Sequence, residues 1–299
     1  MVERLICPLC QGHCFDDPIV LHDRIMRTTT QPFTLGRCVN CGLRRLHPQP
    51  DGATLAAAYP EEYGPHARPG FSGRAKGVLE RRSVRQLSRY LTAPRRVLDV
   101  GCATGDLLLA VRSLGNPDVT GVETSEQASD VARSRGLNVV RGELSDASFP
   151  DESFDTVLLS HTLEHVADPV AFLHEVWRIL APEGVVLLWL PNVDSIEARL
   201  FGRYWIGYDA PRHLTTFSTG TLGRTLAATG FAIDEVRHES IGLEWAWALR
   251  LLAREKIPAV ERVLSRMHPI VIVAFTPAAM IGSQTGRGGR IRVIARKGR

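Results

Sequence analysis

Four cysteines near the start of the chain stand in two pairs whose spacing suits metal binding. Cys7 and Cys10 form one C-x-x-C pair, and Cys38 and Cys41 form the other. Four thiolates would complete a tetrahedral zinc site and leave no open position for a catalytic water. We therefore predict a structural zinc ribbon over residues 1–48, against the simpler alternative of two chance thiol pairs.

A second stretch, VLDVGCATGDLL at residues 97–108, joins an apolar run to a helical one through a glycine turn. Gly101 and Gly105 stand where a backbone can approach a ligand closely, but the third glycine of a dinucleotide site is missing. Asp99 precedes the turn, and Asp106 occupies the place where a pyrophosphate would need a neutral or positive group. The turn therefore favours a cationic ligand over a diphosphate.

The next apolar run ends at Glu123, about twenty residues beyond the turn. An acid at this place accepts hydrogen bonds from ribose hydroxyls in nucleotide-binding folds. A nucleoside that carries a positive charge and no phosphate meets both conditions. S-adenosylmethionine (SAM), an adenosine with a sulfonium cation, is therefore the predicted cofactor.

A scaffold of alternating strands and helices must position these groups. From Arg95 onward, short apolar runs alternate with helical patterns, as expected for strands covered on both faces. The predicted strands cover residues 95–101, 118–123, 138–143, 154–160, 184–191, 231–240 and 290–297. We predict a doubly wound α/β sheet of seven strands in a catalytic domain at 74–299, preceded by a linker at 49–73. A helical insertion at about 241–286 precedes the last strand.

The span from Val97 to Phe231 resembles the class I SAM-dependent methyltransferases. The block FPDESFDTVLLSHTLEHVADPVAFLHEVWRILAPEGVVLLWLPN, at residues 149–192, is similar to their type 11 and type 23 subfamilies, and so is PRHLTTFS at residues 211–218. The cysteine head resembles the same subfamily. The resemblance implies a Rossmann-like methyltransferase fold. Ala103 departs from the usual glycine-rich form, but a small residue suffices where the backbone approaches a ligand.

The resemblance also implies roles for residues at the ends of the predicted strands. Asp99 would order the glycine turn, and Glu123 would bind the ribose. Glu143 would lie near the adenine amino group, with Leu144 packed on the adenine ring. The backbone of the turn would approach the methionine part of the cofactor at Gly101, Cys102, Ala103 and Gly105.

Ser160 and His161 end the fourth predicted strand, where the resemblance places the transferred methyl group. His161 is the first candidate for a general base, which is needed only if the acceptor must lose a proton. His213 is the second, because it follows the fifth strand at the same edge of the sheet. For both, a packing or hydrogen-bonded loop histidine is the alternative. The HTLEH run also matches the H-x-x-E-H pattern of inverted zinc peptidases, but its place at the end of a central strand argues against that activity.

The composition of the whole chain limits its class. The 299 residues are 44% hydrophobic and 23% charged, with a formal net charge of +4. This predicts an ordered globular protein and is too weakly basic to indicate nucleic acid by itself. No apolar run reaches the roughly 20 residues of a membrane span, and the first residues lack the apolar core of a signal peptide, so we expect a cytoplasmic protein.

We predict methyl transfer to a small-molecule acceptor: a sugar, a natural-product intermediate or a lipid-like quinone. One alternative is a zinc-headed ribosomal RNA methyltransferase that meets phosphates with the arginines of a helix at 74–89. Another is an inactive zinc-containing binding protein on the same scaffold. The insertion at 241–286 could be a lid, a dimer contact, a membrane-surface contact or part of the core. Residues expected at the acceptor pocket are Tyr204, Trp205, Tyr208 and Asp209.

Overall fold

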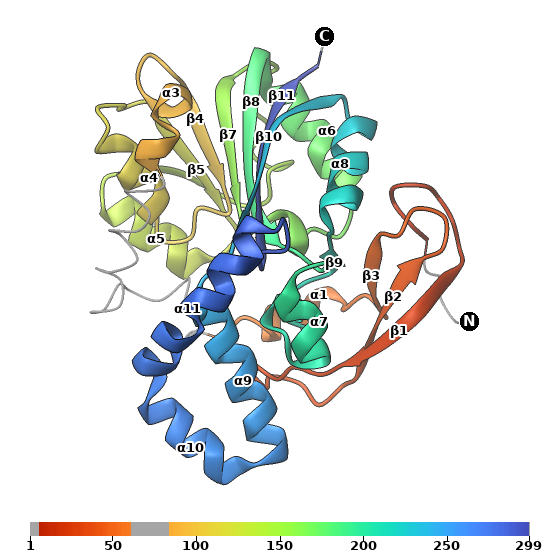
Figure 1. Cartoon of the computed structure of the whole chain (residues 1–299). Helices are drawn as coiled ribbons and strands as arrows, with labels where there is room; N and C mark the ends of the chain where they lie inside the picture. The colour runs from red at the N-terminus through yellow and green to blue at the C-terminus, as the bar shows by residue number, and fades with distance from the viewer. Residues whose placement is uncertain (1–5, 61–83, 299) are drawn as a thin grey trace.

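All seven predicted apolar runs form strands of one sheet. The protein is described here by a computed structural model that covers residues 6–60 and 84–298. The strands are β4 (Val97–Val100), β5 (Val119–Glu123), β6 (Asn138–Arg141), β7 (Phe154–Ser160), β8 (Leu180–Pro191), β10 (Phe231–Glu239) and β11 (Arg290–Lys297). Their order is β10-β11-β8-β7-β4-β5-β6, and β11 is antiparallel to both of its neighbours. The predicted seven-stranded, doubly wound sheet is confirmed (Figure 1).

Helices cover both faces of this sheet (Figure 1). On one face lie α3 (Ser88–Leu91), α4 (Asp106–Arg112) and α5 (Glu126–Ser134), and on the other lie α6 (Pro169–Ile179) and α8 (Thr219–Ala228). Polar side chains fix where several of them begin. Ser125 caps α5, Asp168 caps α6, and Ser218 caps α8 by accepting hydrogen bonds from backbone N–H groups of the first turn.

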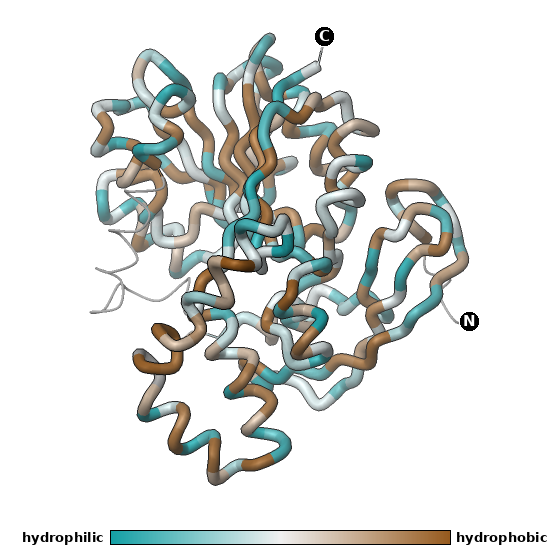
Figure 2. The backbone as a smooth tube through the Cα atoms, viewed as in Figure 1, coloured by the Kyte–Doolittle hydropathy of each residue, from teal (hydrophilic) through white to brown (hydrophobic). Residues whose placement is uncertain are grey.

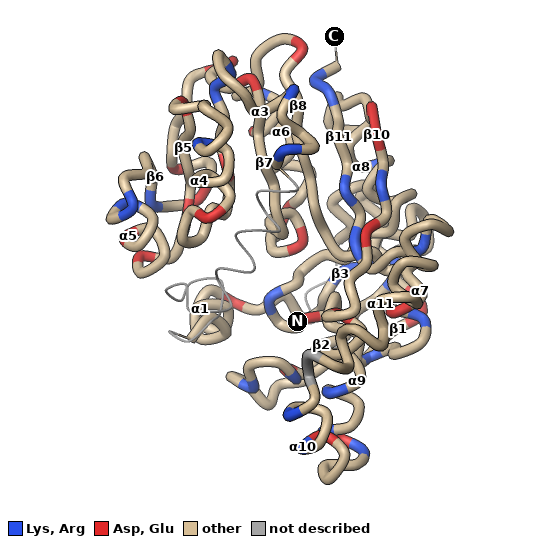
Figure 3. Tube along the Cα trace, turned by 60° about the vertical axis from the view of Figure 1, so that its left-hand side comes forward, with Lys and Arg blue, Asp and Glu red and all other residues tan. Residues whose placement is uncertain are grey.

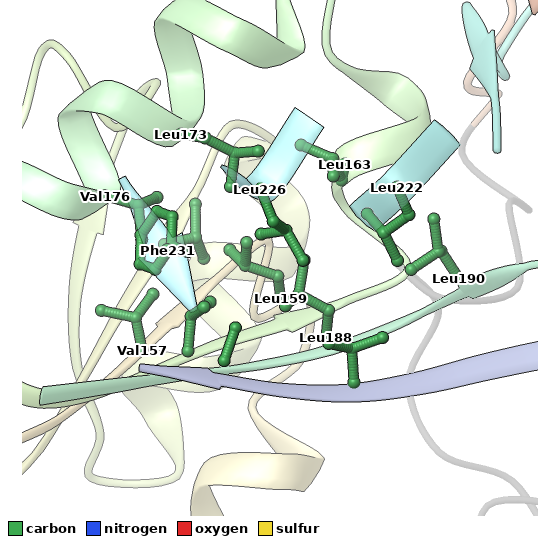
Figure 4. Close-up of a cluster of buried hydrophobic side chains, with 14 of the residues drawn as sticks. Val157, Leu159, Leu163, Leu173, Val176, Leu188, Leu190, Leu222, Leu226 and Phe231 are labelled. Atoms are coloured by element: carbon green, nitrogen blue, oxygen red, sulfur yellow. The ribbon is translucent and has the colours of Figure 1, made fainter. Parts of the chain in front are cut away.

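The core follows the two-residue period of the strands. Val157 and Leu159 of β7 point to the side of α6 and α8, where they pack with residues such as Leu226 (Figure 4). Leu158 packs in the cluster on the opposite face, together with Leu108 of α4. Both faces of β7 are therefore apolar, which explains why its sequence reads as a continuous hydrophobic run.

The N-terminal part forms a separate four-stranded sheet. Strands β1 (Phe15–Leu21), β2 (Phe33–Cys38) and β3 (Arg44–His47) run antiparallel in order, and α1 (Gly52–Ala57) follows. The fourth strand, β9 (Thr215–Thr216), comes from far along the chain and pairs with β3. The sheet is therefore shared between the cysteine-rich head and a segment of the catalytic part. Most of the predicted linker and of the helix at 74–89 lies outside the described residues.

The predicted helical insertion consists of three helices: α9 (Gly242–Lys256), α10 (Pro258–Arg266) and α11 (His268–Gln284). Trp245 of α9 stacks on Phe275 of α11, with ring centroids 5.4 Å apart. Trp245 also packs edge-to-face on Phe201 of the short helix α7 (Ile196–Phe201), so the insertion contacts this helix. The inner side of the insertion thus completes a core.

Several apolar side chains of α10 and α11 are exposed. They are Val260, Val263, Ile270, Val273, Met280 and Ile281. Figure 2 shows hydrophobic stretches along both helices. No single helix in the described part of the chain is long and apolar enough to span a membrane. Helix α10 and residues Ile270–Gln284 together have the length and apolar composition of a membrane span. The chain bends by 92° between these two segments.

Candidate functional site

The turn between β4 and α4 has a backbone that few residues tolerate. Gly101 has a φ of +77° and Gly105 a φ of +80°, in the left-handed region that favours glycine. A Cβ at position 101 would lie 3.0 Å from Thr162 Oγ1, and a Cβ at position 105 would overlap the side chain of Leu137. Ala103, between them, also has a positive φ of +46°. Both glycines are therefore required by backbone conformation and by packing.

Glu123, at the carboxyl end of β5, is joined directly to this turn. Its Oε2 accepts a hydrogen bond of 2.8 Å from the Ala103 N–H, and its Oε1 accepts one of 2.8 Å from the Ser125 N–H. The residue is only 5% exposed. The Thr124 hydroxyl also approaches Oε1, over 3.4 Å. A carboxylate only accepts hydrogen bonds, so the group is of the type that ribose hydroxyls bind in nucleotide sites.

Asp99 and Cys102 lie below the turn. Asp99 is buried, and Cys102 packs so closely on Gly121 that a Cβ at that glycine would come within 2.5 Å of the sulfur. Burial raises the pKa of the Cys102 thiol, and the carboxylates of Asp99 and Glu123 raise it further. The thiol therefore stays protonated, and its side chain is part of the core beneath the turn.

The loop after β6 lies beside the end of β5. The Gly142 N–H donates to the carbonyl oxygen of Glu123 over 3.0 Å, which ties the two strand ends together. Glu143 is exposed, and its N–H donates to Asp146 Oδ2. Leu144 is buried in the hydrophobic core of the same region. The structure thus brings the predicted ribose and adenine residues to one edge of the sheet.

His161 follows β7 at the same edge. It has a φ of +57°, and its N–H donates to the carbonyl oxygen of Trp189 over 2.8 Å. Its Nδ1 lies 3.0 Å from Glu164 Oε1, and its side chain is 40% exposed whereas that of Glu164 is 2% exposed. The next residue, Thr162, donates through Oγ1 to the carbonyl oxygen of Val100 at the end of β4. Ser160 and His161 are therefore connected to the glycine turn through Thr162.

Two further histidines, His165 and His213, lie near the contact between His161 and Glu164. His165 belongs to the 3-10 turn η1 (Leu163–His165), and its ring packs edge-to-face on His213 with centroids 4.7 Å apart. His165 Nδ1 lies 3.0 Å from the carbonyl oxygen of Arg212 and 3.0 Å from the hydroxyl of Tyr59. The structure therefore brings His213 to the H-x-x-E-H run, a contact that the sequence pattern did not predict.

The electrostatics of these groups follow from burial and from their contacts. Burial alone would raise the pKa of Glu164, but the hydrogen bond from His161 and the neighbouring imidazoles lower it to about 2. Burial lowers the pKa of His165 to about 4, assisted by the nearby His213. At neutral pH the site thus holds an ionised Glu164 carboxylate beside a neutral His165 imidazole.

The aromatic residues expected to line an acceptor pocket are mainly core residues. Tyr204, Trp205 and Tyr208 are each no more than 8% exposed, and the Trp205 and Tyr208 rings pack edge-to-face. The Tyr204 hydroxyl donates to Glu255 Oε1 over 2.8 Å. Asp209 forms an ion pair with Arg212. The Tyr204 hydroxyl and the Asp209 carboxylate therefore serve internal contacts.

The four N-terminal cysteines converge as predicted. Cys7 Sγ lies 3.4 Å from Cys41 Sγ, Cys10 Sγ lies 3.4 Å from Cys38 Sγ, and all four sulfurs are within 4.8 Å of one another. Zn–S bonds of about 2.3 Å place tetrahedral sulfurs about 3.8 Å apart, so the cluster fits a four-thiolate zinc site. The Gly42 N–H donates to the carbonyl oxygen of Cys38, which closes the second C-x-x-C turn.

Comparison with protein families gives a match over the catalytic part. A family model described as "Methyltransferase domain" matches residues 74–236. A SAM-dependent methyltransferase from Archaeoglobus fulgidus has a similar structure, with a TM-score of 0.51 and 21% identity, covering 74% of this chain and 94% of that one. At this identity the likeness shows a shared fold.

Curated relatives match shorter stretches. A demethylmenaquinone methyltransferase of Staphylococcus aureus is 33% identical over 99 residues, which are 31% of this chain and 41% of that protein. An uncharacterized 37.1 kDa protein in transposon TN4556 of Streptomyces fradiae is 30% identical over 152 residues, 46% of this chain and 44% of that protein. The matches thus span less than half of the length of these relatives.

Proposed function

The chain belongs to the methyltransferase-domain family and is a SAM-dependent methyltransferase. We propose that the acceptor of its methyl group is a small, lipid-like molecule of the quinone type. The observation that carries the acceptor class is the row of exposed apolar side chains on α10 and α11. The likeness to a protein named demethylmenaquinone methyltransferase supports the same class. A sugar is less favoured as the acceptor, because a polar molecule would not need an apolar surface of this kind. A natural-product intermediate would fit this surface only if it were itself apolar.

The residues at the sheet edge fit the cofactor. SAM supplies an electrophilic methyl group on a sulfonium cation. Gly101 and Gly105 allow the sharp left-handed turn between β4 and α4, and Glu123 is held beside this turn by the Ala103 and Ser125 N–H groups, where it would meet the ribose. Glu143 and Leu144 would serve the adenine. Without a phosphate in the ligand, the acidic residues at this edge are attractive rather than repulsive.

His161 is the proposed general base. If its Nδ1–H donates to Glu164 Oε1, the ring is held in the tautomer whose Nε2 can accept a proton from an acceptor hydroxyl. The carboxylate would also stabilise the imidazolium that forms. His161 is partly exposed and lies at the end of β7, beside the turn to which Thr162 is bonded. His213 packs on His165 and would support the His161–Glu164 pair instead of acting as the base.

We further infer that the cysteine cluster holds a structural zinc ion. Cys7, Cys10, Cys38 and Cys41 would fill the coordination sphere and leave no position for substrate. The zinc would stabilise two tight turns at one end of a sheet that also contains β9. Its role would therefore be to hold the head against the catalytic part.

The exposed face of α10 and α11 would contact either the acceptor or the membrane surface in which such an acceptor dissolves. The nearby basic residues Lys256, Arg262 and Arg266 would favour an anionic lipid surface.

Ribosomal RNA is less favoured as the acceptor. In the view of Figure 3, basic and acidic residues are interspersed along the chain instead of being gathered by sign. Several of the arginines are neutralised by carboxylates; examples are the pairs Arg37–Asp16, Arg96–Asp155, Arg178–Asp151 and Arg296–Asp234. Phosphate binding would have to displace these internal partners.

The test is methyl transfer from methyl-labelled SAM to three classes of acceptor: reduced quinones with a polyprenyl or alkyl tail, free and nucleotide-linked sugars, and ribosomal RNA. We expect label in the organic phase with the reduced quinones. Label confined to the sugars or to RNA would contradict the proposed acceptor. Binding of SAM with no transfer to any extract of lipids or metabolites would favour the inactive-scaffold alternative.

A further inference from the structure

Glu164, His165 and His213 form a cluster of potential metal ligands that methyl transfer does not itself explain. One carboxylate oxygen of Glu164 and one ring nitrogen of each histidine all lie within 4.8 Å of one another. Donor atoms bound to one transition ion at about 2.0–2.2 Å lie about 3–4 Å apart. Small side-chain movements would therefore bring the three donors around a single ion.

Backbone carbonyls set the tautomer of both imidazoles. His165 Nδ1 lies 3.0 Å from the carbonyl oxygen of Arg212, and His213 Nδ1 lies 2.9 Å from that of Gly207. A carbonyl oxygen can only accept, so these contacts favour the tautomer with the proton on Nδ1 and a lone pair on Nε2 in each ring. The Tyr59 hydroxyl, 3.0 Å from His165 Nδ1, would then act as an acceptor there. Metal-binding histidines are commonly oriented by such a hydrogen bond from the other ring nitrogen.

The carboxylate has an oxygen that the protein leaves unsatisfied. Glu164 is 1% exposed, and among the described residues no hydrogen-bond donor reaches its Oε2. A buried carboxyl oxygen without a hydrogen-bond donor is costly. Arg212, the nearest arginine in the sequence to His213, is already paired with Asp23 and Asp209. The unsatisfied Oε2 is therefore a potential ligand atom for an ion bound beside the two imidazoles.

We propose that Glu164, His165 and His213 bind a divalent transition-metal ion at a second metal site, separate from the cysteine cluster. Two imidazoles and one carboxylate suit Zn²⁺, Fe²⁺ or Co²⁺, whereas four thiolates select zinc. Three protein ligands leave at least one coordination position open, which is the arrangement of an ion that also binds a substrate or water.

A metal ion at this site would restrict the acceptor to molecules that carry a hydroxyl group. This part of the inference rests on the proposed function. Glu164 contacts His161 through Oε1, so an ion on its other oxygen would lie next to the proposed base. An acceptor hydroxyl bound to the ion would lose its proton more readily, because a metal ion lowers the pKa of a bound hydroxyl. His161 Nε2 could take that proton. The acceptor would then be an oxygen nucleophile.

The experiment is a Co²⁺ titration of the full chain after metal-free protein has received a single equivalent of Zn²⁺, which the four thiolates bind first. Visible absorption reports nitrogen and oxygen ligation, and thiolate-to-cobalt charge transfer reports any exchange into the cysteines. We expect one Co²⁺ per chain in addition to the zinc, without thiolate bands. Glu164→Gln and His213→Gln should each weaken Co²⁺ binding at least about tenfold. The matched control is His174→Gln, at an exposed histidine of α6.

Three results would overturn the second site: wild-type protein that takes up no Co²⁺ beyond the cysteine cluster, spectra with only thiolate bands, or unchanged affinity in folded His213→Gln protein. The wild-type stoichiometry decides the question even if a variant fails to fold. Calorimetric measurement of SAM binding on the same samples distinguishes failure of the metal site from failure of the proposed methyltransferase function. SAM binding without Co²⁺ binding removes only the metal site, whereas Co²⁺ binding without SAM binding contradicts the cofactor assignment.

Discussion

Arg212 and Asp23 form an ion pair in which both side chains are fully buried, with 2.7 Å between Nη2 and Oδ1. Asp23 follows strand β1 of the N-terminal sheet, and Arg212 directly precedes His213 at the candidate site. A second nitrogen of Arg212 donates to the carbonyl oxygen of Ala58 over 2.9 Å. The pair therefore links the head of the protein to the segment that carries a site residue.

Arg212→Met should destabilise the protein by about 3–5 kcal/mol, because it leaves the Asp23 carboxylate buried without its partner. Chemical denaturation with urea measures the change. The control is Arg37→Met, which removes an ion pair of two largely exposed side chains and should leave the midpoint nearly unchanged. Equal midpoints for both variants would show that the buried pair does not stabilise the fold.

Removing one zinc ligand should empty the cysteine cluster. Elemental analysis of wild-type protein should find at least one zinc per chain, and Cys7→Ser or Cys38→Ser should lose one equivalent and lower the melting temperature. Cys14→Ser is the control, because Cys14 is exposed and lies outside the cluster. Zinc retained in full by Cys38→Ser protein would contradict the four-thiolate site.

Glu123→Gln should weaken SAM binding by roughly tenfold or more, because hydrogen bonds to a charged group contribute about 1.5–3 kcal/mol. The same change disturbs the turn, since Glu123 Oε2 accepts from the Ala103 N–H. Isothermal calorimetry measures the affinity. Glu126→Gln, at an exposed acid of α5, is the matched control and should bind as the wild type does. An unaltered affinity in Glu123→Gln would refute the ribose contact.

His161→Gln should lower turnover about 10²–10⁴-fold while changing the SAM dissociation constant little, if His161 is the base. Single-turnover transfer of labelled methyl and a separate SAM titration provide the two values. His174→Gln serves again as the exposed histidine control. Should turnover persist at the wild-type rate, His161 would be only a loop residue bonded to Glu164.

The sheet could be predicted from the sequence because each strand has its own local signal. The run FDTVLLS is apolar on both faces, and β7 occupies the same residues, 154–160. The C-x-x-C turns are similarly local. Such signals depend on neighbouring residues, which explains why the strands and the cysteine cluster agree with the structure.

The contacts between distant segments had no such signal. Strand β9 contains only Thr215 and Thr216, too few residues for any periodicity, yet it completes the N-terminal sheet. The contact of His165 with His213 depends on how the loop after β8 folds back. The buried state of Trp205 has the same origin, since an aromatic residue in a loop can line a pocket or fill a core.

The most direct measurement of the central claim is a calorimetric titration of the full chain with SAM and, separately, with NAD⁺. The glycine turn and Glu123 predict one SAM per chain, displaced by S-adenosylhomocysteine, and no heat from NAD⁺. Binding of NAD⁺ at the same site, with no binding of SAM, would contradict the assignment of this sheet edge to a cationic nucleoside.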